Sequence, residues 1–486
     1  MKSFDVIIIG YGPTGGTLAS LLVKSNLSVL ILEKEKSLYP LPRAVHFDDE
    51  IMRVFETIGI KEKFKKFTII NKGTKFIDKN GKVLLDWPRP REITENGSYP
   101  SYRFHQPDFE RVIRNHLKRY KNFSFKQNSN VIKIQNTKNY VEIIFEDTET
   151  FKQDILRCKY LVGCDGANSI TRKKINSQFD NLGFNQKWAV IDLILKKNKK
   201  LPDRTIQYAN SKRPATYCRN VGKRRRWEFA IKNNENEKKV VSDNFIWNFL
   251  KPWLKSSEAK IERKAIYTFQ SAIAKKWRKE RIFLAGDAAH LMPPFMGQGM
   301  CAGVRDASNL AWKINHCIKQ GHNEKLLNSF QSERFSNVKE YIQTTMKMGE
   351  FINAMRSYKI ADTVSNQSDG SKSMKSIKPE LGTGLGLKSN KHRGKTFPKF
   401  NIKKYKSFDD IFSTEPVLIV SDNLNVRKLK SKIKIIKEDS YKELSKILKK
   451  FQVEAIIIRP DRFILQTFNS RENFIKNINK TLQGII

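Results

Sequence analysis

The pattern of apolar positions is clearest at the start of the chain. Residues 6–9 form a continuous apolar run, as in a strand that is buried on both faces. Leu18, Leu21 and Leu22 follow at helical spacing, and a second apolar run covers residues 29–32. A strand, a helix and a second strand in this order predict a βαβ unit and a parallel sheet.

Later changes of pattern divide the 486-residue chain. Residues 71–110 and 181–272 carry alternating strand-like runs and predict a separate sheet. Residues 357–400 lose apolar periodicity and are interpreted as a linker or long surface loop. Residues 401–486 regain a compact α/β pattern and predict a small final domain. The rest is assigned to one discontinuous domain that holds the βαβ unit: residues 1–70, 111–180 and 273–356.

Charge and cysteine content change this picture little. The chain has a formal net charge of +43, which raises the hypothesis of a nucleic-acid-binding protein. The excess is mostly lysine and is spread along the chain, so we interpret it as a bias of composition and expect no nucleic-acid partner. The chain has five cysteines, without a CxxC motif and without the spacing of metal ligands. We therefore expect the protein to lie in a reducing cytoplasm and to have no metal site. Because no apolar run is long enough to span a bilayer, we expect no membrane contact.

The first candidate site is the turn between the first strand and helix. Gly10, Gly12 and Gly15 form GxGxxG in the required strand–helix context, and Glu33 ends the second strand. Such glycines let the backbone approach a pyrophosphate at the positive N-terminus of the helix. Glu33 is placed to accept hydrogen bonds from the ribose of an adenosine, so the pattern predicts dinucleotide binding. The alternative is a glycine-rich turn without a ligand.

A second candidate site lies far along the chain, in the segment LAGDAAHLMPPFMGQGM. Residues 281–285 predict a third buried strand, which ends at Gly286 and Asp287. A carboxylate at the carboxyl end of such a strand is placed to bind a polyol, although Asp is also common as a helix cap. Apolar spacing predicts a helix over residues 300–318, whose N-terminus favours negative charge. Asp165, after the strand-like YLVG, offers another acidic turn.

Three motifs together resemble the single-component FAD-dependent aromatic hydroxylases. They are GxGxxG with Glu33, DGxxSxxR from Asp165 to Arg172, and GDAAHxxPPxxGQG from Gly286 to Gly299. The segments PRAVHFDDE, RFHQPDFERVI and IIIRPDRF resemble the branch that contains 3-(3-hydroxyphenyl)propionate hydroxylase. The resemblance covers residues 4 to about 345 closely and 455–470 more faintly.

The resemblance implies both a fold and a reaction. The implied fold is a Rossmann-type, glutathione reductase-like FAD-binding domain with an inserted β-rich substrate domain. A thioredoxin-like domain without CxxC is expected at the C-terminus, and a homodimer is an open expectation. The implied activity is ortho-hydroxylation of a phenolic aromatic acid by molecular oxygen and NADH or NADPH, through a flavin C4a-hydroperoxide, in aromatic catabolism. The alternatives are another FAD oxidoreductase of the same fold (polyketide hydroxylase, epoxidase or reductase) and a basic nucleic-acid-binding flavoprotein.

The resemblance also implies roles for individual residues. Histidines His290 and His46 are candidates for the catalytic base, with a structural loop histidine as the alternative, and Pro294 is expected beside the flavin ring. Arg213, or the run from Arg224 to Arg226, is a candidate for binding a substrate carboxylate, with a solvated basic turn as the alternative. The expected FAD contacts are Gly10, Gly12, Pro13, Thr14, Gly15, Glu33, Lys34, Arg43, Gln106, Asp165, Gly286, Asp287, Pro294, Gly297, Gly299 and Met300.

Overall fold

The N-terminal glycine motif lies on a parallel sheet. A computed structural model describes residues 2–41, 43–354, 364–368, 372–403, 406–411, 414–429, 433–469 and 474–483. Five strands run parallel, in the spatial order β18 (Ile282–Leu284), β11 (Gln153–Gly163), β1 (Ser3–Ile9), β2 (Val29–Leu32) and β8 (Phe123–Lys126). Three antiparallel strands complete this sheet. β17 (Arg278–Lys279) pairs with β18, and β10 (Val141–Asp147) pairs with both β11 and β9 (Ser129–Asn136). The predicted βαβ unit and the predicted third strand are confirmed.

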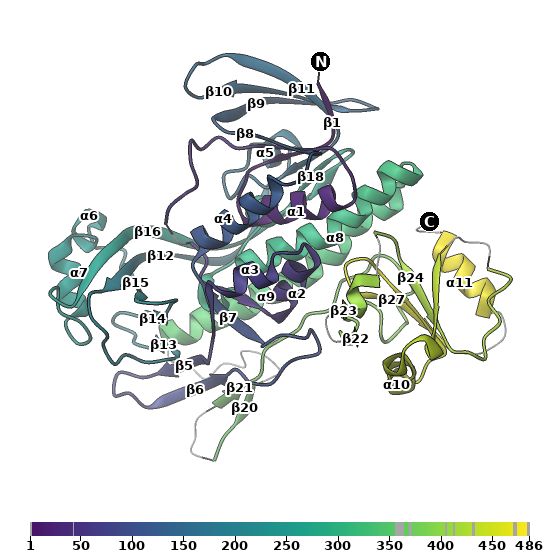
Figure 1. Cartoon of the computed structure of the whole chain (residues 1–486). Coiled ribbons are helices and arrows are strands. Elements are labelled where there is room, and N and C mark those ends of the chain that lie inside the picture. The colour runs from purple at the N-terminus through teal and green to yellow at the C-terminus, as the bar shows by residue number, and fades with distance from the viewer. Residues whose placement is uncertain are drawn as a thin grey trace.

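Helices cover this sheet and carry the second motif. Helix α1 (Pro13–Lys24) begins with proline, whose fixed φ suits the first helical position. It packs between α4 (Gln106–Leu117) and the long α8 (Gly299–Gln320), as Figure 1 shows. The helix predicted over residues 300–318 is therefore confirmed. Two further helices, α5 (Ile170–Lys174) and α9 (Glu324–Ala354), follow β11 and α8.

A ten-stranded sheet forms the second layer of the molecule. It is built mainly from β12 (Phe179–Leu195) and β16 (Ala259–Ala274), the two longest strands. Its outer face packs against α6 (Glu237–Val240) and α7 (Asp243–Leu250), and its inner face is turned toward α9. The other strands are β19 (His290–Leu291), β15 (Arg224–Ala230), β14 (Ala215–Arg219), β13 (Thr205–Tyr208), β5 (Gly73–Ile77), β6 (Val83–Pro88), β21 (Lys372–Met374) and β20 (Val364–Asn366).

The structure divides the chain differently from the sequence analysis at residues 71–110. β5 and β6 do join the large sheet, but β7 (Ser101–Phe104) pairs with β3 (His46–Asp48) and β4 (Thr68–Ile70) in a small sheet. Helices α2 (Asp49–Thr57) and α3 (Lys61–Lys65) lie beside this small sheet. Because α4 packs on α1, the second half of the segment belongs with the parallel-sheet domain.

The segment interpreted as a linker packs against the protein at several of its described residues. β21 pairs with β6, so part of this segment extends the large sheet. Leu381, Leu385 and Phe397 are buried at almost zero exposure, although too few apolar residues occur for a periodic signal. The backbone N–H of Gly382 donates to the Glu333 carbonyl at 2.8 Å. Single buried apolar residues and backbone hydrogen bonds therefore hold this segment, here called the strap, against the protein. A search for periodic apolar positions does not detect such contacts.

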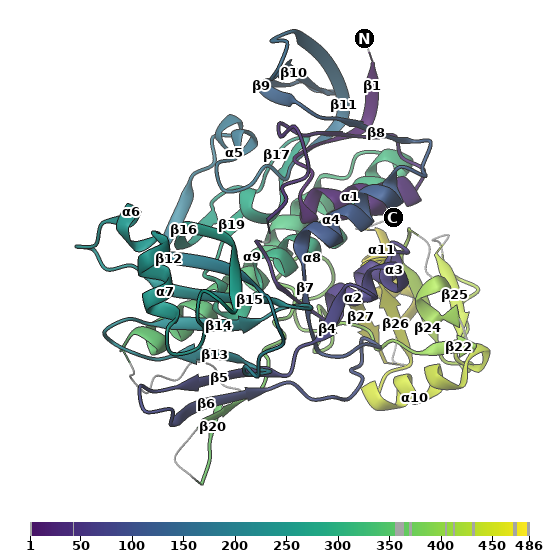
Figure 2. The same cartoon turned by 60° about the vertical axis from the view of Figure 1, so that its left-hand side comes forward.

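The C-terminal unit has the predicted α/β composition. Its sheet has the order β25 (Lys434–Lys437), β24 (Val417–Val420), β26 (Ala455–Ile458), β27 (Ile464–Phe468), in which only β24 and β25 are parallel. Helices α10 (Lys442–Phe451) and α11 (Phe474–Gln483) follow β25 and β27. A short hairpin precedes them, with β22 (Asn401–Lys403) and β23 (Lys406–Ser407). Figures 1 and 2 show this unit beside α2 and α8, away from the large sheet.

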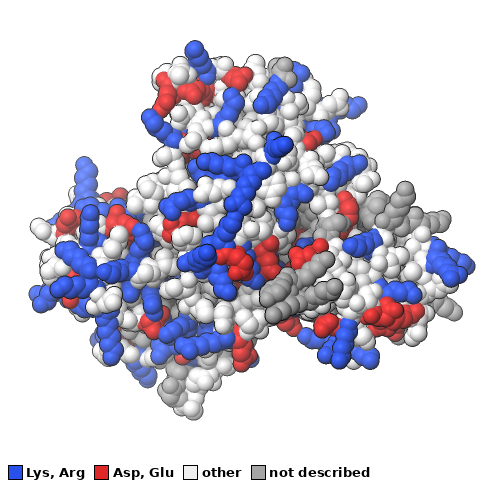
Figure 3. Space-filling model, in the orientation of Figure 1, with Lys and Arg blue, Asp and Glu red and all other residues white. Residues whose placement is uncertain are grey.

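Charge is distributed over the whole visible surface. Figure 3 shows Lys and Arg scattered over every part of that face, with Asp and Glu between them. This distribution agrees with our interpretation of the net charge as a bias of composition. In the part of the chain that the structure describes, no helix is both long and apolar enough to cross a membrane.

Candidate active site

Asp287 lies at the carboxyl end of β18, on the edge where the parallel strands terminate. The flanking residues Gly286 and Ala288 are buried, whereas the Asp287 side chain is exposed. Burial among surrounding protein atoms nevertheless raises the pKa of its carboxyl, and the nearby charges of His290 and Arg43 lower it in part. The carboxylate is therefore open on one side and enclosed on the others. Such a group gains free energy from a ligand that donates hydrogen bonds to it.

A second carboxylate, on α8, holds the Asp287 turn in place. Asp306 is 0% exposed and accepts a hydrogen bond from the Gly286 backbone N–H at 3.0 Å. The same carboxylate contacts His290 Nε2 at 2.6 Å and Arg334 Nε at 2.8 Å. The His290 side chain has no solvent exposure. This geometry favours a positioning role for His290 over the catalytic role expected from the sequence, because a buried ring paired with Asp306 does not face a substrate.

The GxGxxG turn brings backbone donors to the same edge. Gly10 has φ of +99°, and a Cβ there would collide with the Cys164 carbonyl of the neighbouring β11 turn. No side chain caps the N-terminus of α1, so its first N–H groups are left for a ligand. The Glu33 carboxylate accepts from the Tyr11 N–H at 2.7 Å, which orients it beside this turn. Thr14 packs against Gly286 and thereby joins the two motifs.

Two other residues that were expected to contact FAD already have hydrogen-bond partners within the protein. The Asp165 carboxylate accepts from Ser169 Oγ at 2.6 Å and from the Thr171 N–H at 3.0 Å, and so shapes the start of α5. Gln106 accepts from the Ala44 N–H at 2.7 Å and donates to Glu110 at 2.7 Å. We therefore infer that both residues support the backbone around the site. Arg43 is exposed, with its guanidinium 4.5 Å from the Tyr39 ring centre, and Lys34 is also exposed.

The N-terminus of α8 is the second uncapped helix end of the site. Gln298 precedes the helix, but its side chain donates to Asp48 at 3.1 Å and makes no capping bond. Arg305 completes this network with contacts to Asp48 at 2.6 Å and to Gln298 at 3.0 Å. The backbone N–H groups of the first turn are thus left for a ligand. Four expected contact residues in this loop are partly exposed: Pro294, Gly297, Gly299 and Met300.

His46 braces the glycine that precedes α8. Its ring lies against Gly297, which has φ of +66°, and Nδ1 donates to the Gly297 carbonyl at 3.1 Å. Nε2 accepts from Ser101 Oγ at 2.7 Å. Burial, followed by the charges of Arg103 and Arg89, lowers the pKa of His46 to about 3, so the ring is neutral. Both ring nitrogens are occupied, which favours a positioning role over the catalytic role expected from the sequence.

These features fit the shape and charge of FAD. The two uncapped helix ends supply donors for a pyrophosphate and for the electron-rich edge of a flavin. Glu33 and Asp287 supply acceptors for the hydroxyl groups of a ribose and a ribityl chain. Gly12 has open space where a side chain would stand, which leaves room for close approach of a ligand to the backbone. The observed donors and acceptors thus match a flavin dinucleotide along its length.

The loop before α8 connects this edge to the inner face of the large sheet. Phe295, next to Pro294, packs edge-on against Phe184 and Trp188, at ring-centre distances of 5.6 and 5.5 Å. Phe269 lies at 6.1 Å from the same ring. An aromatic wall therefore stands beside the candidate flavin edge. Phe295, Phe184 and Trp188 are only 6, 7 and 0% exposed, so this wall excludes water beside the loop.

The two arginines expected to bind substrate have partners elsewhere. Arg213 lies over the rings of Phe229 and Phe245 on the outer side of the sheet and pairs with Glu235. The structure thus does not bring Arg213 to the inner face, and this expectation is corrected. Arg224 Nε contacts Glu262 at 3.1 Å and is half-buried.

Arg226, in the run Arg224–Arg226 that the sequence offered for a substrate carboxylate, is a buried arginine of the inner face, whereas Arg89 and Arg103 were missed from the sequence. Arg226 pairs with Asp192 at 2.7 Å and donates to the Arg43 carbonyl at 2.9 Å. Arg103 and Arg89 lie near His46. The alternation of Arg224 and Arg226 in β15 was an available signal, because residues two apart share one face of a strand. No local pattern marks Arg89 or Arg103.

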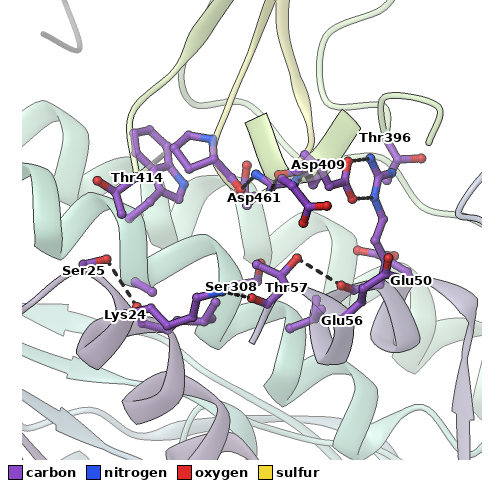
Figure 4. A pocket seen from close by; sticks show the side chains of 18 of the residues that line it. Lys24, Ser25, Glu50, Glu56, Thr57, Ser308, Thr396, Asp409, Thr414 and Asp461 are labelled. Atoms are coloured by element: carbon purple, nitrogen blue, oxygen red, sulfur yellow. Dashed lines mark hydrogen bonds and ion pairs between the residues drawn. The ribbon is translucent and has the colours of Figure 1, made fainter. Parts of the chain in front are cut away.

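A separate cavity lies between the C-terminal unit and the helices of the FAD domain. It has a volume of about 480 Å³ and is lined by none of the expected FAD contacts, although Glu50 and Asp461 belong to the segments PRAVHFDDE and IIIRPDRF. Figure 4 shows Lys24, Glu56 and Thr57 on one side of it and Asp409 and Asp461 on the other. A buried ion pair between Arg53 and Asp409, at 2.6 Å, crosses between the two parts of the protein. This cavity therefore belongs to the contact between domains.

The fold and the site define a protein that binds FAD on a parallel α/β sheet. The FAD binding domain family matches residues 3–345. The chain therefore belongs to this family.

Two curated relatives are similar to this chain over more than two thirds of its length. The chain is 35% identical over 366 residues to a probable NADH-specific resorcinol 4-hydroxylase of Rhodococcus jostii, with 74% of this chain and 67% of the relative covered. It is 31% identical over 360 residues to a 3-(3-hydroxy-phenyl)propionate/3-hydroxycinnamic acid hydroxylase of a Mycobacterium species, with 72% and 60% covered. The chain thus spans about two thirds or less of the length of these relatives.

Solved structures show the same fold. A complex of aklavinone-11 hydroxylase with FAD and aklavinone has a TM-score of 0.81 at 14% identity, with 100% of this chain and 99% of that chain covered. The p-nitrophenol 4-monooxygenase of Pseudomonas putida DLL-E4 has a TM-score of 0.66 at 23% identity, with 74% and 91% covered. At these identities, the likeness concerns the fold alone.

Proposed function

We propose that this protein is an FAD-dependent monooxygenase that consumes NADH or NADPH and hydroxylates a phenolic aromatic compound ortho to its hydroxyl group. The observation that carries the proposal is the loop with Pro294 and Phe295. It joins the candidate flavin edge at the start of α8 to the aromatic wall on the large sheet. A flat aromatic ring bound at that wall lies beside the cofactor.

The names of the relatives support this chemistry. One relative is named for 4-hydroxylation of resorcinol with NADH, and the other for hydroxylation of 3-(3-hydroxyphenyl)propionate. Both names describe hydroxylation of a phenol, which is electron-rich and therefore open to attack by an electrophilic oxygen. The epoxidase, reductase and polyketide hydroxylase alternatives have no support among these two names. No specific observation favours a nucleic-acid-binding flavoprotein.

The chain's own residues have distinct tasks in this proposal. Bound FAD supplies the oxygen activation and the acceptance of hydride. Glu33 and Asp287 hold its hydroxyl groups, and the first N–H groups of α8 stabilise negative charge at the flavin edge. Pro294 forms a wall beside the ring. The aromatic residues around Phe295 exclude water, which protects the reactive oxygen species from unproductive decay.

We also propose that the C-terminal unit is a thioredoxin-like domain without redox chemistry. Its strand order and the helices after β25 and β27 support this assignment. It has no CxxC motif, so we assign it no disulfide exchange. The five cysteines are free, which supports a reducing cytoplasm. A homodimer remains a proposal that light scattering of the purified protein tests.

The direct test measures NADH and NADPH oxidation by FAD-loaded protein, with resorcinol, 3-(3-hydroxyphenyl)propionate or no phenol. Hydroxylated product and hydrogen peroxide are quantified in the same samples. We expect at least tenfold stimulation by one phenol, with product formed in step with NAD(P)H consumed. The methyl ether 3-(3-methoxyphenyl)propionate is the matched control without a phenolic hydroxyl. Bound FAD without stimulation or product from any phenol would contradict the proposal.

A further inference from the structure

Two guanidinium groups near the candidate site, those of the buried Arg103 and the half-buried Arg89, have no carboxylate within ion-pair distance among the described residues. Arg103 is 7% exposed, and its only side-chain hydrogen bond among the described residues goes to the Thr205 hydroxyl. Arg89 stacks on Trp87, with 3.8 Å between the guanidinium carbon and the ring centre. Its Nη1 atom is buried without a hydrogen-bond partner. Within the described ranges, neither arginine has an acidic oxygen within 4.0 Å.

Neighbouring arginines in and beside the large sheet are paired. Arg226 and Arg263 both contact Asp192, at 2.7 and 3.0 Å. Arg204 pairs with Asp86. A buried guanidinium without a partner is costly, because the protein does not replace the hydration that the charge loses. The lack of a partner at Arg89 and Arg103 is therefore a local feature that requires a counter-charge from elsewhere.

The Arg89–Arg103 pair lies near the loop that precedes α8. Arg103 of β7 is the direct register partner of His46 in β3, and the His46 ring lies against Gly297. On its other side, Arg103 reaches Thr205 of β13 in the large sheet. The pair thus lies between the small sheet and the large sheet, with His46 between it and the candidate flavin edge.

Burial and neighbouring charges shift the pKa of both guanidinium groups. Burial lowers the pKa of Arg89 to about 9, and the neighbouring Arg103 contributes further to the lowering. Burial also lowers the pKa of Arg103, and the nearby Glu228, which makes no ion pair with it, opposes that shift. The charges of Asp48 and Asp49 oppose the shift at Arg89, but do not remove it. Both guanidiniums still carry a proton at neutral pH, so the local potential is positive and an anion bound there is stabilised.

We propose that Arg89 and Arg103 bind an anionic group of the substrate, a carboxylate, and that the protein therefore prefers a phenolic acid to a neutral phenol. This inference rests on the proposed hydroxylase function and names its substrate class. Guanidinium groups recognise carboxylates through charge-assisted hydrogen bonds of fixed geometry. The unpartnered Nη1 of Arg89 is a donor for such a bond. The sequence-based candidate Arg213 has its partner in Glu235 and does not take this role.

The experiment compares two ligands that differ in charge and share a phenol and a three-carbon side chain. Dissociation constants of 3-(3-hydroxyphenyl)propionate and 3-propylphenol are measured from the change in flavin absorbance of the FAD-loaded protein. We expect the wild-type protein to bind the acid at least tenfold more tightly. Arg89→Gln and Arg103→Gln should each weaken binding of the acid about 10- to 100-fold, because a charged hydrogen bond is lost from a buried site. Binding of 3-propylphenol should stay within about twofold.

Two further variants serve as matched controls. Arg91→Gln removes one positive charge from an exposed position two residues away and should leave both constants unchanged. Arg89→Lys keeps the charge without the guanidinium geometry and should recover part of the affinity for the acid. FAD content and melting temperature are recorded for each variant, so that loss of binding is separated from loss of folding.

The outcomes separate this inference from the proposed function. Equal binding of the two ligands by the wild-type protein overturns the inference, whatever the variants do. Equal loss of both ligands in Arg89→Gln and Arg103→Gln also overturns it. Hydroxylation of 3-propylphenol that depends on neither arginine leaves the hydroxylase proposal standing and removes the anion site. A wild-type protein that binds and hydroxylates no phenol overturns both.

Discussion

Buried charged side chains are paired within the protein at the carboxyl edge of the parallel sheet, whereas the side chains of Arg89 and Arg103 are not paired with any described carboxylate. At the edge, each buried carboxylate already has its partners inside the protein: Asp306 has Gly286, His290 and Arg334. At the arginine pair, two cations lie against an aromatic ring and a hydroxyl without a carboxylate. The first arrangement is complete in the chain alone, and the second requires an additional anion.

This difference separates the residues that build a site from those that meet its ligand. Asp165, Gln106 and His46 belong to the motifs, yet their polar atoms are used to hold backbone turns. Asp287 is the exception among the motif acids, because its carboxylate is exposed and has no hydrogen-bond partner among the described residues. A motif therefore identifies the geometry of a site more reliably than it identifies each ligand contact.

The largest expected effect comes from breaking the paired arrangement at Asp306. Asp306→Asn leaves the buried Arg334 and His290 without their carboxylate, so we expect the free energy of unfolding to fall by about 3–5 kcal/mol. The loss should appear in urea unfolding of protein without FAD. Asp154→Asn is the control, because Asp154 is exposed and pairs with Lys126 only at 3.6 Å; a change below about 0.5 kcal/mol is expected. Similar stabilities of the two variants would show that the Asp306 network is not a support.

Asp287→Asn should separate ligand binding from folding. We expect the FAD dissociation constant to rise about 10- to 100-fold, because hydrogen bonds to a charged acceptor are lost. The raised pKa means that the folded protein binds this proton more tightly than the unfolded chain does. Protein without FAD therefore gains stability as pH falls through that pKa, and Asn at this position should not lower stability at neutral pH. Fluorescence titration with FAD and urea unfolding measure the two effects; full retention of FAD affinity would refute the assignment.

His46 should give a pH dependence of stability with a defined sign. Its pKa is about 3 in the folded protein and about 6.5 in an unfolded chain, so the unfolded chain binds the proton more readily between these values. Stability should therefore fall as pH decreases below 6.5, by up to about 1.4 kcal/mol per pH unit from this residue. His46→Gln should be less stable at pH 7.5 but should show a shallower slope between pH 6.5 and 5. Parallel slopes for the two proteins in urea unfolding would contradict a buried neutral His46.

Much of the fold was predictable because its signals are local. The βαβ unit, the strand before Asp287 and the helix from Met300 each have a periodic apolar pattern within one segment. The strap after α9 was not predictable in this way, since Leu381, Leu385 and Phe397 are single anchors in a polar segment. The division at residues 71–110 depended on strand pairing, because β7 joins β3 and β4 only in three dimensions.

The candidate site was predictable where motifs carry it and not elsewhere. Gly10, Glu33 and Asp287 were found from their positions after buried strands. Arg89 directly follows β6 and Arg103 lies in β7; both are near His46, and no spacing in the sequence relates them. The choice of Arg213 failed for the same reason, since Arg213 lies in the connection before β14 and its side chain packs over Phe229 and Phe245 on the outer side of the sheet.

The smallest expected effect is that of Arg213→Gln, and it sharpens the comparison with Arg89. Arg213 is partly exposed, pairs with Glu235 and lies over Phe245 on the outer face of the sheet. A pair in that setting contributes at most about 1 kcal/mol to stability, because water screens it. The dissociation constant of 3-(3-hydroxyphenyl)propionate should therefore stay within about twofold of the wild-type value, against a change of about tenfold or more for Arg89→Gln. A larger loss in Arg213→Gln than in Arg89→Gln would move the carboxylate site to the outer face, where a cation that already has its carboxylate would have to exchange it for the substrate.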